Sequence, residues 1–262
     1  MLRHMKSSIK ILLFLYVFFA AHVSFAKDEA RQELMKKIIM DNGFTYAKDL
    51  YLNKDSHLSE TGKGLFESKH LSLNGKIACV TCHNSESGSS DGIPNAAGIG
   101  GYGEGVTRLK SGAKVIPRNS LALWGVGSKG FNTLFWDGKL IFKGKNTISQ
   151  FGSTAPSCDP LITAVHLPAV EIRETLDEDS FITEYKKEDI KGAKIIYKEI
   201  VKNLKKKEIT LMSTLAKQNQ LPFDDTKFIH VASAIAAFIR DEFKIKETRL
   251  ERFISGQISF NE

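Results

Sequence analysis

Apolar side chains recur at helical spacing in several parts of the chain. Over residues 28–43 they share one face of a predicted helix: Leu34, Met35, Ile38 and Ile39. Gly43 ends this pattern, as expected of the residue that follows a helix C-terminus. The spacing therefore predicts a helix near the start of the chain.

Two further stretches have the same periodicity. Residues 59–68 predict a helix that Ser59 caps at its N-terminus. Residues 224–243 predict the clearest helix of the chain, capped by Asp224 or Asp225. The apolar face of this helix consists of Ile229, Ala232, Ile235, Ala236 and Ile239.

Between these helices the pattern is irregular. Residues 84–117 are rich in glycine and poor in apolar residues, which predicts a long loop that lies against something rigid. Residues 118–156 mix turn residues with dispersed aromatic residues: Trp124, Phe131, Phe135, Trp136, Phe142 and Phe151. After Glu171 the pattern is helical again. The chain is thus mainly helical, with long irregular loops.

The first 26 residues have the pattern of a secretory signal peptide. Three basic residues precede the apolar run ILLFLYVFFA: Arg3, Lys6 and Lys10. Small residues at 24–26 predict cleavage after Ala26 and export to the periplasm. An uncleaved anchor is the alternative, but residues 11–26 are fewer than the roughly 20 apolar residues of a spanning helix. The remainder is long enough for one good-sized domain or two small ones.

The charge of the exported chain is only mildly positive. The signal peptide contains three of the 37 basic residues and none of the 30 acidic ones, which leaves a formal net charge of about +4. Such an excess can steer an acidic partner, but it does not indicate nucleic acid binding. Residues 186–208 interleave lysines with apolar residues, as on the solvated face of a helix.

The sequence GKIACVTCHN contains Cys79, Cys82 and His83 in the pattern C-x-x-C-H, which is typical of covalently attached haem c. Two thiols separated by two residues reach the two vinyl groups of one porphyrin, and the next residue presents an imidazole to the iron. A disulfide or a zinc pair is the alternative for these thiols. Cys158 is then left without a partner, as an inert loop thiol, a free reactive thiol or an intermolecular bridge.

The second axial ligand of the iron decides between an electron carrier and an enzyme. A second strong ligand gives a closed electron-transfer haem, whereas a free position lets peroxide bind. The methionines of the exported chain are expected to pack or to lie on the surface: Met35, Met40 and Met212. The same holds for His57, His70 and His230, whereas His166, five residues before Glu171, is a candidate distal ligand.

The segment GKGLFESKHLSLNGKIACVTCHN resembles the first haem segment of the bacterial dihaem cytochrome c peroxidases, a family that includes MauG, a methylamine dehydrogenase maturation enzyme. The likeness continues through PRNSLALWGVG, LFWDGK, VEI and VASAIAAFIRDEF, and covers about residues 50–255. It implies an all-α, cytochrome c-like haem domain with long irregular loops at 51–245. Residues 27–50 are then an N-terminal helix and linker, and 246–262 a tail that leads, in relatives, to a second haem domain.

The resemblance also implies roles for individual residues. Cys79 and Cys82 match the thioether attachments of the peroxidatic haem, and His83 matches its proximal ligand. Glu171 matches the distal glutamate that moves a proton between the peroxide oxygens, and Gln150 approximates a distal glutamine that steadies the leaving oxygen.

Three residues around 118–136 complete this comparison. Trp136 matches a conduit for electrons between the two haems, and Arg118 is a candidate cofactor contact. Asn119 corresponds to a residue that helps to bind calcium at the domain boundary in relatives.

The chain also departs from the family pattern. Many relatives have a histidine in the loop after the haem motif, but residues 84–117 contain none, and Tyr102 is the substitute to consider. Ile172 stands where relatives have methionine, and RNSL lacks their proline. The second C-x-x-C-H of the family is absent from the sequence.

The resemblance implies a periplasmic haem c peroxidase with one covalent haem, and with calcium as a further candidate. It would reduce hydrogen peroxide to water with electrons from a small cytochrome c or cupredoxin, or through a separate chain that carries the second haem. The alternatives are a non-enzymatic electron-transfer cytochrome c, a MauG-like oxidase that matures a partner protein, and a non-functional remnant.

Overall fold

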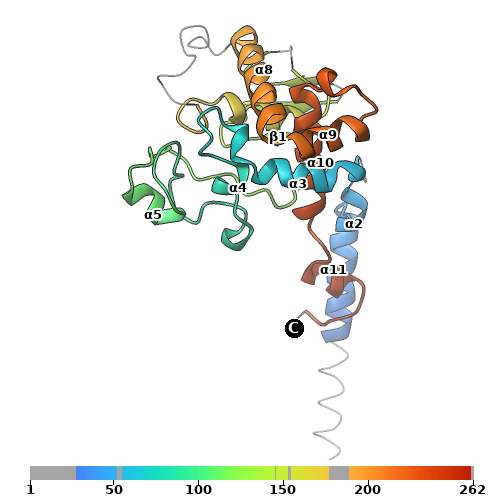
Figure 1. Ribbon diagram of the computed structural model, residues 1–262. Coiled ribbons are helices and arrows are strands. Elements are labelled where there is room, and N and C mark those ends of the chain that lie inside the picture. The colour runs from blue at the N-terminus through green and yellow to red at the C-terminus, as the bar shows by residue number, and fades with distance from the viewer. Residues whose placement is uncertain (1–27, 52–54, 145, 153–154, 177–188, 261–262) are drawn as a thin grey trace, which may run out of the picture. The chain divides into compact units, whose positions relative to one another are not determined.

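The computed structural model describes residues 28–51, 55–144, 146–152, 155–176 and 189–260 (Figure 1). The chain divides into two compact units, one from Tyr51 to Ile245 and the other from the residues up to Leu50 with those from Lys246 onward. The predicted signal peptide, 1–26, lies outside the described residues. Among the helices that are described, none is both long and apolar enough to cross a bilayer.

The smaller unit contains the predicted N-terminal helix. Its helices are 28–41, α2 (Ala47–Leu50) and α11 (Arg249–Ile254). Gly43 has a φ of +80°, which confirms it as the residue that ends the first helix. Leu34 and Ile38 are more than half exposed, so the apolar face predicted for this helix is not buried among the described residues. The buried Glu251 joins α11 to α2 by accepting a hydrogen bond from Ala47 N at 2.5 Å.

The larger unit is mostly helical. Its α-helices are α3 (Ser59–Glu67), α4 (Cys79–Cys82), α5 (Gly105–Lys110), α6 (Pro160–His166), α8 (Ile190–Lys207), α9 (Ile209–Gln218) and α10 (Phe228–Glu242). Its 3₁₀ turns are η1 (Ser56–Leu58), η2 (Lys69–Leu71), η3 (Ser85–Ser87), η4 (Pro168–Val170) and η5 (Phe223–Asp225). As predicted, α8 buries its apolar face and carries lysines on the other side.

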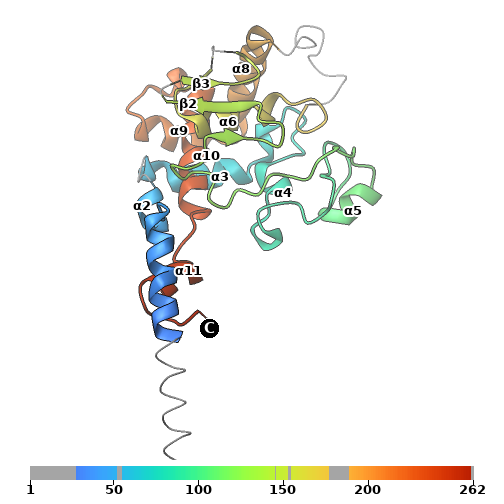
Figure 2. The same ribbon diagram turned by 180° about the vertical axis from the view of Figure 1, so that it is seen from behind.

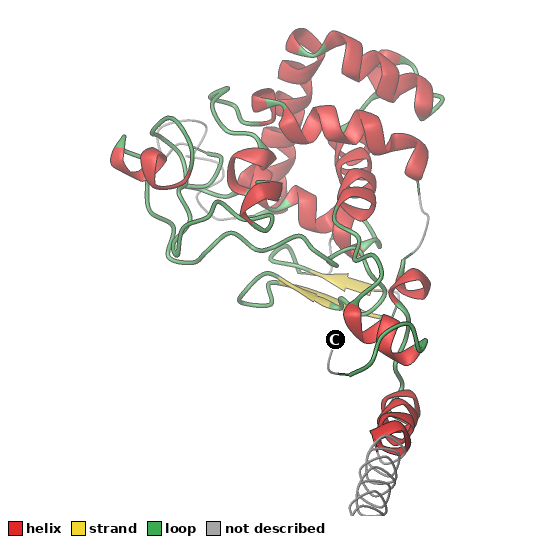
Figure 3. Ribbon diagram, turned by 90° about the horizontal axis from the view of Figure 1, so that it is seen from below, coloured by secondary structure: helices red, strands yellow, loops and turns green. Residues whose placement is uncertain are grey.

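A small sheet corrects the expected all-α class. Its strands are β1 (Thr133–Leu134), β2 (Leu140–Lys143) and β3 (Asn146–Ile148), antiparallel in the order β1-β2-β3. Leu134 pairs with Leu140, and Phe142 pairs with Thr147 (Figure 3). The sheet lies in the region of dispersed aromatic residues, where strands this short give too little alternation to be recognised. The fold is therefore mainly helical with a minor sheet.

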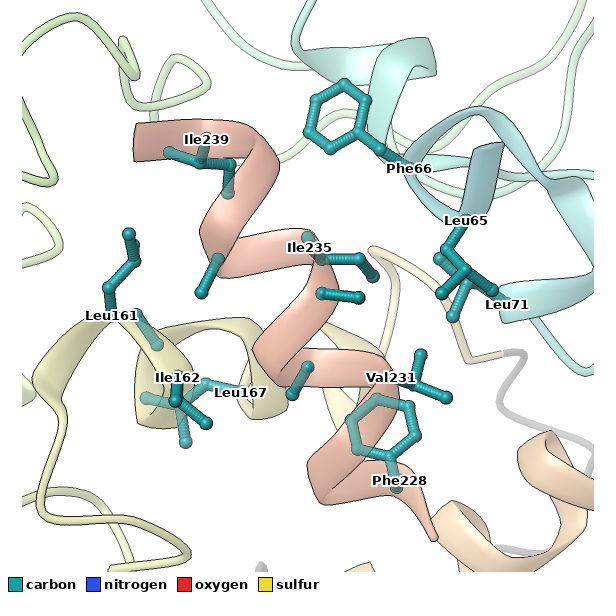
Figure 4. Packing of buried hydrophobic residues seen from close by; sticks show 14 of the residues in the cluster. Leu65, Phe66, Leu71, Leu161, Ile162, Leu167, Phe228, Val231, Ile235 and Ile239 are labelled. Carbon is teal, nitrogen blue, oxygen red and sulfur yellow. The ribbon is translucent and has the colours of Figure 1, made fainter. Parts of the chain in front are cut away.

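Helix α10 runs through the core of the larger unit. It packs against α3 on one side and α6 on the other (Figure 4). The predicted apolar face is confirmed, except that Ile229 is only half-buried; Val231, Ala234 and Phe238 are buried as well, so the helix is enclosed on most sides. At the crossing with α3, Gly62 approaches so closely that an added Cβ would lie 1.9 Å from Ala234 O.

The predicted N-caps of α3 and α10 are wrong. Ser59 is the first residue of α3, because η1 runs directly into that helix, and its hydroxyl donates to Asp241 Oδ2 at 3.1 Å. The N-cap of α10 is Lys227, because Asp224 and Asp225 belong to η5. Both errors arise from short 3₁₀ turns that precede the helices.

Asp159 fixes α6 to α10. Its carboxylate caps α6 by accepting from Leu161 N at 3.0 Å. It also accepts two hydrogen bonds from Arg240 of α10, at 2.6 and 2.8 Å, and both side chains are nearly buried. Helix α6 in turn contacts β2, so α6 packs against both the sheet and α10 (Figure 2).

The glycine-rich loop 84–117 has a small core of its own, formed by Ile93, Ala97 and Ala113. Arg108, on α5, is 3% exposed and donates to the carbonyl oxygens of Ala97, at 2.7 Å, and Gly98. This buried guanidinium explains how a segment with few apolar residues is held in place.

Candidate functional site

A cavity of about 390 Å³ lies in the larger unit, between the haem-motif segment and the segment that follows α6. Its floor is α10, which contributes Phe228, Ile235 and Ile239. Residues 116–121 and 134–139 line it as well. Most of the predicted site residues meet here.

One wall presents two thiols and an imidazole. Helix α4 is a single turn, closed by a hydrogen bond from His83 N to Cys79 O at 3.0 Å, so Cys79, Cys82 and His83 all line the cavity. The two thiols are free. His83 Nδ1 lies 3.1 Å from Ser89 O, and a further hydrogen bond joins the side chain to the backbone of Leu121, so two backbone contacts orient the ring.

Burial keeps these three groups neutral. It raises the pKa of Cys79 to about 12, with a further contribution from Cys82, and it raises the pKa of Cys82 too, although Arg108 lies 3.7 Å from Cys82 Sγ. Burial also lowers the pKa of His83. A reactive dithiol needs a thiolate, so the raised pKa values of Cys79 and Cys82 do not favour that alternative. A neutral imidazole suits an iron ligand.

Glu171 lines the same cavity. Its Oε2 accepts a hydrogen bond from Lys139 Nζ at 3.0 Å, and the two side chains are 28% and 21% exposed. Lys139 also lies 4.8 Å from the centre of the Phe135 ring. This part of the cavity lining is therefore a partly buried ion pair beside an aromatic face.

A second carboxyl group, Glu174, lines the same cavity. Burial is the main cause that raises its pKa to about 7, and the negative charge of Glu171 adds to it. Sequence reasoning missed Glu174, although the spacing E-x-x-E after the VEI motif was a signal that pointed to it.

Trp136, Arg118 and Asn119 also line the cavity. Trp136 Nε1 donates to Asn119 O at 2.8 Å, and the side chain is 61% exposed, so it reaches from the cavity to the surface. Arg118 pairs with Asp137 at 3.1 Å. Asn119 Oδ1 and Ser120 Oγ are buried and have no hydrogen-bond partner among the described residues.

The structure does not bring Gln150 to the cavity. This residue is half-buried in a tight turn in which Ser149 and Gly152 exchange hydrogen bonds of 3.1 and 2.8 Å. The turn directly follows β3, and the sheet was not visible in the sequence pattern. The polar group beside Glu171 is the ammonium of Lys139 instead.

The candidate second iron ligands lie elsewhere too. His166 packs edge-on against Tyr197 and Phe228, its Nδ1 is 2.7 Å from Ile162 O, and burial lowers its pKa to about 4. Tyr102 is 76% exposed, and Met212 is fully buried in the core. Among the described residues that line the cavity there is no methionine and no histidine besides His83.

The cavity fits one haem c and gives less support to calcium. Two free thiols in one helical turn, an oriented imidazole and a largely apolar lining match the donors and surroundings that haem c requires. For calcium, Asn119 Oδ1 is a free oxygen, but no group of three or more His, Cys, Asp or Glu residues that could hold a metal ion exists in the described parts of the chain. Cys158 is exposed and away from the cavity lining.

Comparison with known proteins agrees with this chemistry. A family model described as di-haem cytochrome c peroxidase matches residues 56–259. The methylamine utilization protein MauG of Methylorubrum extorquens is 49% identical over 39 residues, which make up 15% of this chain and 11% of that protein.

Proposed function

Because the chain belongs to the di-haem cytochrome c peroxidase family, we propose that it is a c-type haem peroxidase that reduces hydrogen peroxide to water. Membership makes it an oxidoreductase of the cytochrome c peroxidase and MauG type. One observation carries the finer proposal: His83 and the two thiols line the same cavity as the Glu171–Lys139 pair.

Cys79 and Cys82 would hold one haem c through thioether bonds, with His83 as the proximal ligand. Arg118 and the unpartnered hydroxyl of Ser120 supply hydrogen-bond donors that suit the haem propionates. The bound haem supplies an iron that coordinates peroxide and exchanges electrons.

Glu171 would move the proton. Its carboxylate accepts a proton from one oxygen of the peroxide and returns it to the other oxygen, which leaves as water. Lys139 holds this carboxylate in place at 3.0 Å, and its charge stabilises the anionic form that exists before the first transfer and again after the second. Leu134 and Phe135 lie in the cavity wall beside this pair and restrict the access of water.

The electrons would come from a small periplasmic cytochrome c or cupredoxin, or from a separate chain that carries the second haem of the family. The exposed ring of Trp136, which borders the cavity, is the group best placed to receive them. Export by the signal peptide predicted at 1–26 is part of this proposal, as is calcium at Asn119 with ligands from outside the described residues.

Two rival functions make different predictions. An electron-transfer cytochrome needs a second strong iron ligand, and the described cavity lining offers no such histidine or methionine, which favours the peroxidase. A MauG-like oxidase would use the same cavity on a partner protein. The 39-residue match to MauG and the exposed Trp136 favour this as the second candidate.

Stopped-flow mixing of the purified ferric haem protein with hydrogen peroxide tests the proposal. We expect a rapid peroxide-dependent spectral change in the wild type and a decrease in its rate by about 10²–10⁴-fold in E171Q. The exposed Glu60 on α3 provides the matched control, E60Q, which should react as the wild type does. A wild-type spectrum that peroxide leaves unchanged would disprove peroxidase activity.

A further inference from the structure

The turn after η4 places two carboxyl groups in the cavity wall. Glu171 O accepts hydrogen bonds from Thr175 N and Leu176 N, both at 3.2 Å, and Arg173 N donates to Leu176 O at 3.0 Å. These bonds close residues 171–176 into a compact turn. Glu171 and Glu174, three residues apart in it, both line the cavity.

The loop that follows the haem motif fixes this turn. Ile99 N donates to Arg173 O at 2.8 Å, and an added Cβ at Gly98 would lie 2.0 Å from that oxygen. Arg173 itself has a φ of +74°, which a residue with a side chain adopts only where its surroundings require it. The position of Glu174 is thus set by tertiary contacts.

The two carboxyl groups have different surroundings. Glu171 has a cation at 3.0 Å, whereas no lysine or arginine in the described parts of the chain forms an ion pair with Glu174. Glu174 is half-buried. A partly buried carboxyl group that has no ion-pair partner is more stable with its proton than one that has such a partner.

We propose that Glu174 is a second proton-carrying carboxyl group of this cavity and that it supplies protons to Glu171. This inference rests on the proposed peroxidase function. Reduction of one peroxide to two waters consumes two electrons and two protons, and the external redox protein provides the electrons. In each transfer the O–H bond of Glu174 breaks, an O–H bond forms on the Glu171 carboxylate, and Glu174 regains a proton from solvent.

The charges that face Glu174 are consistent with this role. Burial and the charges of Glu171 and Asp137 raise its pKa, Lys139 and Arg118 lower it, and the net result is a pKa of about 7. The charge of Glu174 in turn contributes to the raised pKa of Cys82, after burial as the largest cause. A group with a pKa near neutrality can both give and regain a proton.

Infrared difference spectroscopy of the ferric haem protein, without peroxide, tests the assignment directly. The wild type should show a protonated carboxyl band that titrates with a midpoint near pH 7. E174Q should lose this band. E171Q should shift the midpoint to lower pH and K139M to higher pH, because each removes one of the charges that act on Glu174. The control E60Q should leave the titration unchanged.

Turnover gives a second readout. E174Q should react with the first equivalent of peroxide at a rate close to that of the wild type but slow steady-state turnover by about tenfold or more. If E174Q retains the full titration, or if E171Q leaves its midpoint unchanged, the role of Glu174 is refuted even when the enzyme is active. If the wild type shows the carboxyl titration near pH 7 but does not reduce peroxide, the proposed peroxidase function is refuted instead.

Discussion

Replacing Gly62 with alanine tests how closely α3 and α10 pack. A Cβ atom at this position would lie 1.9 Å from Ala234 O and 3.0 Å from Phe238 Cβ. A close carbon–oxygen contact is about 3.3 Å, so the helices would have to separate by about 1.4 Å. A backbone carbonyl cannot rotate away as the end of a flexible side chain can, and the whole crossing has to move.

Two opposing terms set the expected change in the free energy of unfolding. Alanine is favoured over glycine by about 1 kcal/mol in a helix interior. Extra atoms forced into a packed core cost about 1–3 kcal/mol, and occasionally more. Because the obstacle is backbone, we expect the upper end of this cost and a net loss of about 2 kcal/mol, or a decrease in Tm of about 4–8 °C.

Thermal and urea unfolding, followed by circular dichroism, measure this loss. Gly130→Ala is the matched control, because no atom lies within 4 Å of an added Cβ there and its φ is not positive. We expect it to change stability by no more than about 0.5 kcal/mol. A G62A protein as stable as this control would refute the close approach of α3 to α10 at Gly62.

Three further predictions concern buried and exposed groups. His166 has a pKa of about 4 in the folded state and about 6.5 in the unfolded state, so the unfolded state gains a proton first as the pH falls. We therefore expect the free energy of unfolding to decrease by about 3 kcal/mol between about pH 7 and pH 4. In urea unfolding, H166F should show a weaker dependence of this free energy on pH. D159A removes both the α6 cap and the partner of Arg240 and should lower the free energy of unfolding by about 3–5 kcal/mol. The control E199Q, which breaks an exposed ion pair, should lower it by less than about 0.5 kcal/mol. Equal urea midpoints for the two variants would contradict this prediction. C158S should leave unfolding and haem content unchanged, whereas C79A/C82A should remove the haem stain from a denaturing gel.

The sequence predicts the features that depend on local spacing. The haem motif brings Cys79, Cys82 and His83 together within one helical turn, so their meeting in the cavity needs no knowledge of the fold. The apolar periodicity of α10 and the lysine-rich face of α8 are equally local. The resemblance to a family extends this to Glu171, which lies far along the chain but lines the same cavity.

Features that arise from tertiary contacts were not predictable. Lys139 reaches Glu171 only because the short sheet turns the chain back, and that same sheet carries Gln150 away from the cavity. The position of Glu174 depends on how Gly98 meets Arg173, two residues 75 positions apart in the sequence. His166 looked like a ligand because it is close to Glu171 in sequence, yet one helical turn directs its ring to the aromatic side of α10.

The two contacts of α10 act together as a rigid frame. The Gly62–Ala234 crossing holds α3, the helix that precedes the His83 segment, against α10. The Arg240–Asp159 pair holds α6, the helix that precedes Glu171, against the same helix. The relative positions of the segments that contain His83 and Glu171 are therefore set by one helix, α10. Substitutions along the buried length of α10 should therefore change the surroundings of His83 and Glu171 at once, without altering either residue.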